Sequence, residues 1–283
     1  MCAPIKVFVI NLAKDVAKYQ RMEAICRAMG FDFEIFPAVN GNKLSQIEID
    51  KGYSEEDSIK KMGRPLARAE IGCAFSHITI YHKIIENNIP LALILEDDID
   101  FTDDFLLLLN KLLCTEKNWE CILLGHHAGR SRNIDPITSY WFRKKIEGTA
   151  YRLCRPIELA CGTYGYLINE SGAKRLLKET IIISKPIDHY TGLRQHNNLY
   201  VCIPPVIFIH SRSESESNLT EDRNELEKIW ALKRKETHKK IISKIEHLLI
   251  YRLWLKIGPN IISVFRKQRH MILRRLKPYF KIR

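Results

Sequence analysis

Runs of apolar residues alternate with segments of helical spacing up to about residue 210. Residues 5–12 are mostly apolar and rich in β-branched side chains, which predicts a strand buried on both faces. Apolar positions then recur at helical intervals over residues 15–29, with Asp15 as a possible cap and Gly30 as a stop. A second strand over residues 31–39 ends at an Asn-Gly turn. This strand–helix–strand opening indicates an α/β sheet.

The same alternation continues through the body of the chain. We expect helices over 65–87, 103–113 and 170–180, the last with Ser171 as a possible cap, and strands over 91–95, 120–125, 163–169 and 199–210. The last strand, interrupted by two prolines, is predicted at the edge of the sheet. Residues 42–63 favour a loop or short helices, and 126–158 an irregular, functional loop with many basic and aromatic positions. The fold class is therefore α/β, with a mainly parallel, Rossmann-like sheet flanked by helices.

A polar stretch over residues 211–218 separates this body from a basic tail. The 283-residue chain has a net charge of +12, but residues 223–283 hold 18 Lys/Arg and 4 Glu, a net of +14, which leaves −2 for residues 1–222. We expect a catalytic domain over 1–218 and a C-terminal basic helical extension over 219–283. A nearly neutral body argues against nucleic acid as a partner.

Two amphipathic helices are predicted in the tail, separated by Gly258 and Pro259. Basic amphipathic helices bind anionic membrane surfaces, and this is the partner that we expect for the tail. Packing of the helices against the body or a second subunit is the alternative. No apolar run approaches the ~20 residues of a membrane-spanning helix. The N-terminal pattern predicts a strand and not a signal peptide.

Eight cysteines are present, and none forms a Cys-x-x-Cys pair. Several lie within apolar stretches, for example Cys73 and Cys121. The spacing of metal ribbons and disulfide frameworks is missing, so we expect reduced thiols in a reducing compartment. Together with the N-terminus, this predicts a cytoplasmic protein.

Clustered acids follow the predicted strand 91–95: Glu96, Asp97, Asp98 and, one residue later, Asp100. Ligands of open α/β sheets bind outside the carboxyl ends of the strands. Glu96 and Asp98 point the same way if the strand persists, and their repulsion favours a divalent cation bound to substrate phosphate. Asp98 and Asp100 have the same spacing, so either pair fits. A solvated acidic loop and the metal site of a phosphohydrolase are the alternatives.

The longest informative segment is ARAEIGCAFSHITIYHKIIENNIPLALILEDDI, residues 67–99. It resembles the core signature of glycosyltransferase family 25, the bacterial lipooligosaccharide transferases. VFVINLAKDVAKYQRM, FEIFPAVNG, CGTYGYLINESGAKRLL and KPIDHY resemble other segments of this family in the same order. The resemblance covers about residues 5–212, and the tail matches only in being basic.

This resemblance implies a GT-A fold, a UDP-sugar donor, inversion at the anomeric carbon and a lipid-linked oligosaccharide acceptor. UDP-galactose is the first expectation for the donor. Asp98 is then the predicted ligand of Mn²⁺ or Mg²⁺ on the donor diphosphate, with Glu96 and Asp97 on the ribose or around the metal. His210 would complete the metal shell, and His189 competes with it for that role.

The general base that inversion requires is predicted to be Asp188, with Glu158 as the second candidate. By the resemblance, donor contacts fall on Asn11, Leu12, Arg21, Ser76, His77, Gly162, Thr163 and Gly165. Each of these has a plain alternative, as a packing residue or a solvated charge. We therefore expect a metal-dependent inverting hexosyltransferase that extends lipooligosaccharide.

Its expected location is the bacterial cytoplasm, peripheral on the inner face of the cytoplasmic membrane. Two alternatives are open: a catalytically inactive GT-A module that acts as a membrane-surface scaffold, and a metal-dependent phosphohydrolase. The chain has no glycine-rich P-loop, Gly-x-Gly-x-x-Gly, Gly-x-Ser-x-Gly or His-Glu-x-x-His motif.

Overall fold

The structure, a computed structural model, describes residues 5–114, 118–129, 134–210, 223 and 225–233. Two compact units are formed, residues 1–226 and 227–283, whereas the sequence predicted a boundary at 218. Of the predicted tail helices, the structure describes residues 223 and 225–233, which are helical; the remainder lies outside the described residues. Among the helices that are described, none combines the length and the hydropathy needed to cross a membrane.

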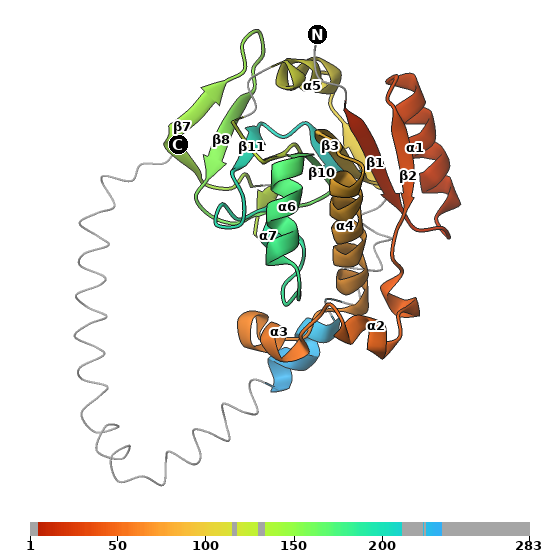
Figure 1. Cartoon of the computed structure of the whole chain (residues 1–283). Helices are drawn as coiled ribbons and strands as arrows, with labels where there is room; N and C mark the ends of the chain where they lie inside the picture. Colours follow the sequence, from red (N-terminus) through yellow and green to blue (C-terminus); the bar gives the residue numbers. More distant parts are fainter. Residues whose placement is uncertain (1–4, 115–117, 130–133, 211–222, 224, 234–283) are drawn as a thin grey trace, which may run out of the picture. The chain divides into compact units, whose positions relative to one another are not determined.

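One eight-stranded sheet organises the first unit, in the order β2-β1-β3-β10-β5-β11-β8-β7 (Figure 1). Its strands are β1 (Lys6–Asn11), β2 (Phe33–Pro37), β3 (Leu91–Glu96), β5 (Cys121–Leu123), β7 (Thr138–Lys145), β8 (Arg152–Pro156), β10 (Gly165–Asn169) and β11 (Leu199–Ile203). β10 and β8 run antiparallel to the strands beside them, and the other six share one direction. The predicted α/β fold with a mostly parallel sheet is confirmed.

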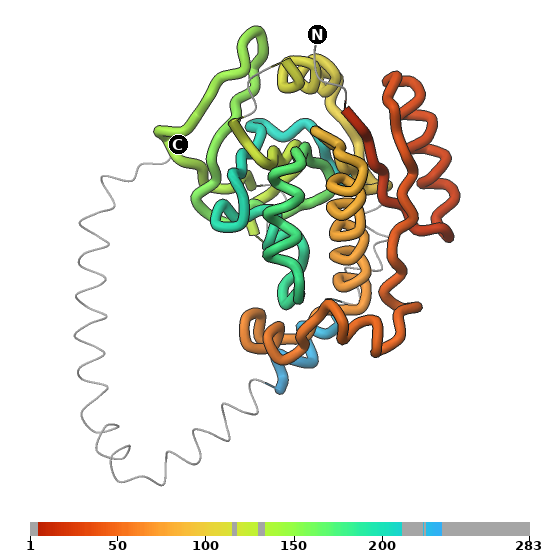
Figure 2. Tube along the Cα trace, viewed as in Figure 1, coloured from red at the N-terminus to blue at the C-terminus, as the bar shows by residue number. Residues whose placement is uncertain are grey.

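Helices cover both faces of the sheet. α4 (Arg68–Glu86) and α6 (Glu170–Glu179) lie side by side on one face, as Figure 2 shows. α1 (Val16–Ala28) and α5 (Phe105–Leu113) contribute to the hydrophobic core of the other face. Because side chains alternate along a strand, Phe8 and Ile10 of β1 enter the first core while Val7 and Val9 enter the second. Helices cover both faces of the central strands, which explains why these strands are apolar at nearly every position.

The helix caps differ in part from those expected. α6 is capped by Asn169, whose side-chain oxygen accepts from the Gly172 N–H at 2.8 Å. The predicted cap, Ser171, instead donates its hydroxyl to Glu120 at 3.0 Å. Asp15 precedes α1 but makes no side-chain cap hydrogen bond.

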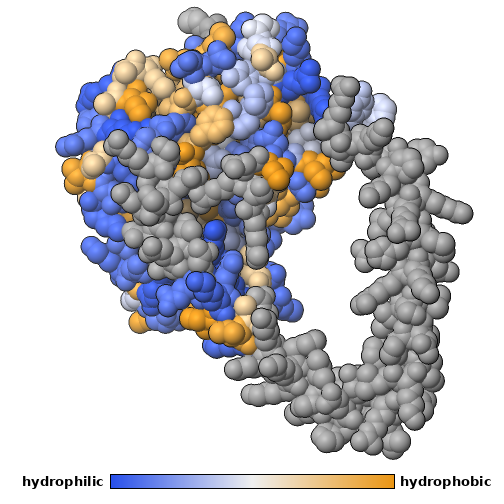
Figure 3. Space-filling view, turned by 180° about the vertical axis from the view of Figure 1, so that it is seen from behind, coloured by the Kyte–Doolittle hydropathy of each residue, from blue (hydrophilic) through white to orange (hydrophobic). Residues whose placement is uncertain are grey.

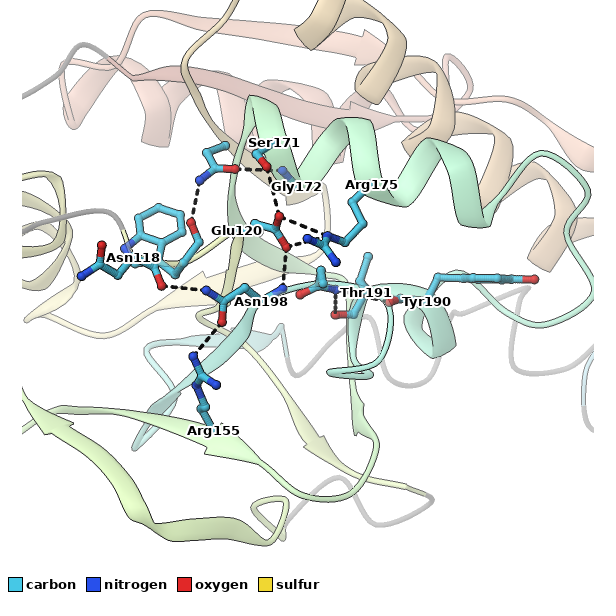
Figure 4. A network of polar contacts seen from close by, with 12 residues as sticks. Asn118, Glu120, Arg155, Ser171, Gly172, Arg175, Tyr190, Thr191 and Asn198 are labelled. Atoms are coloured by element: carbon cyan, nitrogen blue, oxygen red, sulfur yellow. Dashed lines mark hydrogen bonds and ion pairs between the residues drawn. The ribbon is translucent and has the colours of Figure 1, made fainter.

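Glu120 joins three elements at the edge where β5 begins (Figure 4). Its carboxylate accepts hydrogen bonds from Ser171 and Arg175 of α6 and, at 2.6 Å, from the Asn198 N–H just before β11. Asn198 in turn accepts from Arg155 of β8 at 2.9 Å. Because these bonds lie at the amino ends of β5 and β11, they fix α6 on the sheet at the edge away from the acid cluster.

The region predicted as an irregular loop contains the hairpin β7–β8, and this changes the place of the last strand. β11 lies between β5 and β8 and is not an edge strand, so that prediction is wrong. The sequence beyond its prolines forms β12 (Ile207–Ile209), which pairs with β4 (Ile99–Phe101) in a separate two-stranded sheet. A second small sheet joins β6 (His127–Ala128) to β9 (Ala160–Cys161).

Short helices occupy the segment that the sequence left as a loop or short helices. They are η1 (Gly41–Lys43), α2 (Gln46–Asp50) and α3 (Glu55–Met62). Another short helix, α7 (Asp188–Thr191), lies elsewhere in the chain, after α6. Ser45 and Ser54 cap α2 and α3 through their side-chain oxygens. The helix starts thus follow the serine caps of the sequence.

The edge strand β7 exposes three consecutive aromatic side chains: Tyr140 is 75%, Trp141 85% and Phe142 53% exposed. Basic residues follow directly in the same strand, and we call this surface the β7 edge, made of Tyr140, Trp141, Phe142, Arg143, Lys144 and Lys145. On the opposite view of the molecule, apolar and polar residues are intermingled over the visible surface (Figure 3).

Cysteines are mostly free, as predicted. Free thiols are Cys26, Cys73, Cys121, Cys154, Cys161 and Cys202. Cys114 is disulfide-bonded, so the expectation of reduced thiols is wrong for this residue.

Candidate active site

The predicted acids lie at one edge of the central sheet. β1 and β3 are parallel neighbours, and their carboxyl ends carry Asn11 and Glu96. β10 runs the other way, so the residues that precede it reach the same edge. The Glu96 N–H donates to the Tyr164 carbonyl at 3.0 Å, which places the segment before β10 directly beside the acids.

Asp97 is buried and already has partners. Its Oδ2 accepts from the Asn11 side-chain amide at 2.7 Å, and its Oδ1 lies 3.3 Å from Nζ of Lys18 on α1. Burial raises the pKa of Asp97, against the opposing effects of Lys18 and Asn11. Burial alone would lower the pKa of Lys18, but the charges of Asp97 and Asp98 raise it overall. Asp97 therefore orients the end of β1 and is not free to bind ligand with both oxygens.

Asp98 has one carboxylate oxygen whose hydrogen bonding is not satisfied by the described residues. Its Oδ1 is buried and has no hydrogen-bond partner within the described part of the chain, and its Oδ2 is 3.8 Å from Lys18 Nζ. Burial, followed by the charge of Glu96, raises the pKa of Asp98 to about 6. A buried carboxylate oxygen without a donor is costly unless a cation or a proton reaches it. The donor set fits a hard divalent ion, with Asp98 and Glu96 as the available oxygen ligands.

Asp100 belongs to a different group. It forms an ion pair with Arg21 of α1, and its Oδ2 lies 2.6 Å from Nδ1 of His210. Arg21 supplies Asp100 with positive charge and His210 with a hydrogen-bonding contact, whereas the Asp98 carboxylate has only the more distant Lys18 Nζ at 3.8 Å among the contacts of the described residues. The structure therefore favours Glu96 and Asp98 over Asp98 and Asp100 as the metal-binding pair.

The same contacts bear on the roles predicted for Arg21 and His210. Arg21 is held by Asp100, which is a structural alternative to its predicted contact with nucleotide. The His210 ring also bonds to Asp100, while its backbone N–H donates to the Asp98 carbonyl at 2.7 Å. His210 is thus next to Asp98 in space, but its Nδ1 is already engaged.

Ser76 and His77 on α4 have different environments. Ser76 is fully buried; its hydroxyl accepts from the Val39 N–H and donates to the Gly72 carbonyl, both at 2.8 Å. Ser76 therefore holds α4 against the chain beyond β2, which does not fit the predicted donor contact. His77 is also buried, but its Nε2 faces the site, 3.9 Å from Oε1 of Glu96.

Gly162 and Thr163 lie in the turn before β10. Gly162 has a φ of +106°, and a Cβ at this position would lie 2.4 Å from the ring of Tyr164. Glycine is therefore required by the backbone and by Tyr164 packing. Gly165 is likewise required, because its Cβ would clash with Ile207. Thr163 is buried, and Leu12 is half-buried immediately after β1.

The two candidates for the base differ sharply. Asp188, the first residue of α7, has a buried Oδ1 without a partner among the residues described. Its charge adds to burial in raising the pKa of Cys161 and of Cys73, so it lies on the α4 side of the site. Glu158 instead accepts a hydrogen bond from the Ile137 N–H at 2.7 Å in the preceding loop. The structure thus brings Asp188, and not Glu158, to the Cys73 side of the cluster.

His189 follows Asp188 in α7, whereas the His210 ring contacts Asp100. Burial lowers the pKa of His189, against the charge of Asp188. Neither Lys18 nor Tyr166 was predicted to be a site residue. Lys18 had one usable signal, because the first turns of a helix that follows a strand lie at the carboxyl edge of the sheet.

Comparison with known proteins agrees with this geometry. The profile of glycosyltransferase family 25 (LPS biosynthesis protein) matches residues 4–191. This chain therefore belongs to glycosyltransferase family 25, as its motifs predicted.

Relatives of two kinds are found. Procollagen galactosyltransferase 1-A of Xenopus laevis is 30% identical over 193 residues, which are 65% of this chain and 30% of that protein. A probable inactive glycosyltransferase 25 family member 3 of Rattus norvegicus is 30% identical over 131 residues, 42% of this chain and 22% of that one. The matched part is thus less than a third of either relative.

Among solved structures, a glycosyltransferase involved in the glycosylation of the major capsid of PBCV-1 superposes with a TM-score of 0.30. The match has 12% identity and covers 61% of this chain and 63% of that one. This likeness is too low to support an argument about function.

Proposed function

We propose that this chain is a metal-dependent, inverting hexosyltransferase that uses a UDP-sugar, with UDP-galactose as the first candidate. The observation that carries the proposal is the buried Oδ1 of Asp98, which has no hydrogen-bond partner among the residues that the structure describes and lies beside Glu96 at the carboxyl edge of the sheet. Membership in family 25 supports the reaction class, and the galactosyltransferase names of its relatives support the sugar.

The site residues have separate roles in this proposal. Asp98 and Glu96 would hold Mn²⁺ or Mg²⁺, which would stabilise the negative charge of the leaving diphosphate. Asn11 and Lys18 orient the Asp97 carboxylate and favour its ionised form, against the effect of burial. Gly162 and Thr163 lie in the turn before β10, whose Tyr164 carbonyl accepts from the Glu96 N–H.

Asp188 is the proposed general base. The acceptor hydroxyl would give its proton to the Asp188 carboxylate as its oxygen bonds to the anomeric carbon. The bond from that carbon to the diphosphate breaks in the same step, and UDP leaves from the opposite face. This accounts for inversion with one carboxylate on the acceptor side.

Lipooligosaccharide is the proposed acceptor, as the family's description as an LPS biosynthesis protein supports. Procollagen is the acceptor that the names of several relatives indicate for those proteins. The two acceptors differ in chemistry, because one presents a sugar hydroxyl on a lipid and the other a hydroxyl on a polypeptide.

We also propose that the enzyme works at an anionic membrane, on the inner face of the bacterial cytoplasmic membrane. The basic sequence of residues 223–283 supports this, and so does the β7 edge. Exposed Trp and Tyr beside Lys and Arg are the residues that proteins place at the membrane interface.

The decisive assay measures UDP release from a panel of UDP-sugars with Mn²⁺, in the presence of lipooligosaccharide or a procollagen peptide. We expect turnover with UDP-galactose and lipooligosaccharide, and an inverted linkage in the product by NMR. Asp98→Ala should abolish release, whereas Asp103→Ala, an exposed acid of the following loop, should not.

Two alternatives give different results in this assay. An inactive module, of the kind that one relative's name indicates, would release no UDP from any donor. A metal-dependent phosphohydrolase would cleave phosphate esters at the same rate with and without acceptor. Either result would overturn the transferase proposal.

A further inference from the structure

Three potential metal ligands of different types meet behind the acid cluster. Cys73 and His77 are four residues apart on α4, so they lie on one face of the helix, one turn apart. Their ligand atoms and a carboxylate oxygen of Glu96 all lie within 4.8 Å of one another. The two elements α4 and β3 thus bring a thiol, an imidazole and a carboxylate to one point.

The His77 ring is oriented by a contact at Nδ1, the ring nitrogen that does not face Glu96. Its Nδ1 lies 2.8 Å from the hydroxyl of Tyr166, which is 2.8 Å from the hydroxyl of Tyr81. Its Nε2 is buried and has no hydrogen-bond partner in the part of the chain that the structure describes. Histidines that bind metals usually have the second ring nitrogen fixed in this way. A buried nitrogen without a hydrogen-bond partner is otherwise destabilising.

The charges around this group are negative. After burial, the largest effects that raise the pKa of the Cys73 thiol come from the carboxylates of Glu96 and Asp188. Oδ1 of Asp188 is also buried without a partner among the described residues. A cation at this point would therefore be stabilised by more than its direct ligands.

We propose that Cys73, His77 and Glu96 form a transition-metal site of the zinc type, distinct from the Asp98 position. Sulfur and imidazole ligands favour Zn²⁺ or Co²⁺ over Mg²⁺ and Ca²⁺. Zinc bonds of about 2.0–2.3 Å put tetrahedral ligand atoms about 3.3–3.8 Å apart. His77 Nε2 and Glu96 Oε1 are 3.9 Å apart and the whole set of ligand atoms lies within 4.8 Å, so metal binding would draw the three side chains together by at most about 1 Å.

Metal binding at this site would release one proton. The thiol proton of Cys73 passes to solvent, and its sulfur binds the metal as a thiolate. In the tautomer with the proton on Nδ1, His77 donates to the Tyr166 hydroxyl, and the Nε2 lone pair is available for the metal. The remaining coordination position is open to water.

Glu96 is shared with the acid cluster, which couples the two sites. A metal ion bound to Cys73 and His77 would draw the Glu96 carboxylate toward α4 and away from Asp98. Zn²⁺ and the ion proposed for sugar transfer would then compete for one side chain. We therefore expect micromolar-range additions of Zn²⁺ to weaken Mn²⁺ binding in the wild type but not in Cys73→Ser.

The test uses Co²⁺ with the full chain, without donor or acceptor. We expect a sulfur-to-cobalt charge-transfer band in the near ultraviolet, lost in Cys73→Ser and retained in Asp98→Asn. Cys26→Ala, which changes a buried thiol of the opposite core, is the matched control and should keep the band. Circular dichroism checks that each variant is folded. A band that persists in Cys73→Ser, or cobalt binding without a band in the wild type, would overturn the proposal.

A second measurement requires no variant. Peptide mass spectrometry follows the alkylation of Cys73 by iodoacetamide in the wild type with Zn²⁺, with Mg²⁺ or with neither ion. We expect Zn²⁺ alone to suppress the reaction at Cys73. Equal alkylation in all three conditions would refute the site. Because neither measurement involves a sugar, failure here is distinguishable from failure of the proposed transferase activity.

Discussion

The side-chain amide of Asn11 lies 2.7 Å from Oδ2 of Asp97, and this bond joins the end of β1 to the end of β3. Asn11 is 4% exposed, so water has little access to the pair. The amide supplies Asp97 with a donor, and Lys18 supplies it with charge. The acid cluster is therefore anchored at Asp97 and open at Asp98.

Removal of this anchor should affect both stability and activity. Asn11→Ala leaves a buried carboxylate oxygen without its donor, which should lower the free energy of unfolding by about 1–3 kcal/mol. UDP release should fall as well, because Asp98 is the next residue in the chain. Urea denaturation and initial rates measure the two effects. Asn87→Ala removes an amide that bonds only at an exposed helix end, and it should change neither.

Asp98→Asn should stabilise the metal-free protein at neutral pH. The folded pKa of Asp98 is about 6, against a usual value of 3.8. The folded state therefore binds the proton more tightly than the unfolded state does. The stability contribution is full below pH 3.8 and is lost as pH rises through 6. An asparagine avoids this loss, so the variant should gain on the order of 2 kcal/mol at pH 7.5 and nothing near pH 3.5.

Thermal denaturation at both pH values, in the presence of a chelator, checks this prediction. Addition of Mn²⁺ should raise the melting temperature of the wild type and leave that of Asp98→Asn nearly unchanged. If the variant were less stable than the wild type at pH 7.5 without metal, burial would not be the cause of the raised pKa.

Gly162→Ala should be strongly destabilising. Its φ of +106° is unfavourable for any side chain, and the new Cβ would lie 2.4 Å from the Tyr164 ring. We expect a loss of about 2–4 kcal/mol in urea denaturation. Gly129 provides the control, because it has a φ of +47° and open space around the position of a Cβ. Gly129→Ala should cost only about 1 kcal/mol, and equal losses would show that Tyr164 packing is unimportant.

The β7 edge should contribute to membrane binding. The double variant Trp141→Ala/Lys144→Glu removes an aromatic anchor and reverses one charge. At about 1 kcal/mol per basic residue, binding of the full chain to anionic vesicles should weaken at least roughly tenfold. Flotation with phosphatidylserine-containing and purely phosphatidylcholine vesicles measures this effect.

The control for the β7 edge lies on another surface. Ile47→Ala/Lys51→Glu changes an exposed apolar residue and an exposed lysine in and directly after α2. Its binding should fall less than that of the β7 variant. Equal binding of the wild type and both variants would place the membrane contact elsewhere or nowhere.

The sequence predicted the position of the acids better than it predicted their contacts. Glu96 and Asp98 were expected at the edge of the sheet because a buried strand that runs into charge must end there, and β3 does end at Glu96. Lys18 was missed because a single lysine on a helix has no distinguishing pattern. The link from Cys73 to Glu96 depends on how α4 packs against β3, which local spacing does not encode.

The sheet edge was predicted wrongly for a physical reason. β7 is exposed on both faces, so its residues show no alternation of apolar and polar positions. Without β7, the hairpin was not recognised, and β11 was left as the outermost strand. The alternation of the buried elements, in contrast, was sufficient to predict β1, β3, β5 and β10 and the helices between them.

The choice between Asp188 and Glu158 is the sharpest test of the catalytic assignment. Asp188 has a buried oxygen without a partner within the described ranges and acts electrostatically on Cys73, whereas Glu158 caps the Ile137 N–H. Asp188→Asn keeps the shape but cannot accept the proton of the acceptor hydroxyl, so kcat should fall about 10²–10⁴-fold with little change in the KM for UDP-galactose. Glu158→Gln keeps the hydrogen bond to Ile137 and should retain kcat within about threefold. Steady-state kinetics with lipooligosaccharide as acceptor measures both variants. The reverse order of effects would move the base to Glu158, and a fall in both would indicate that each variant disturbs the acceptor side.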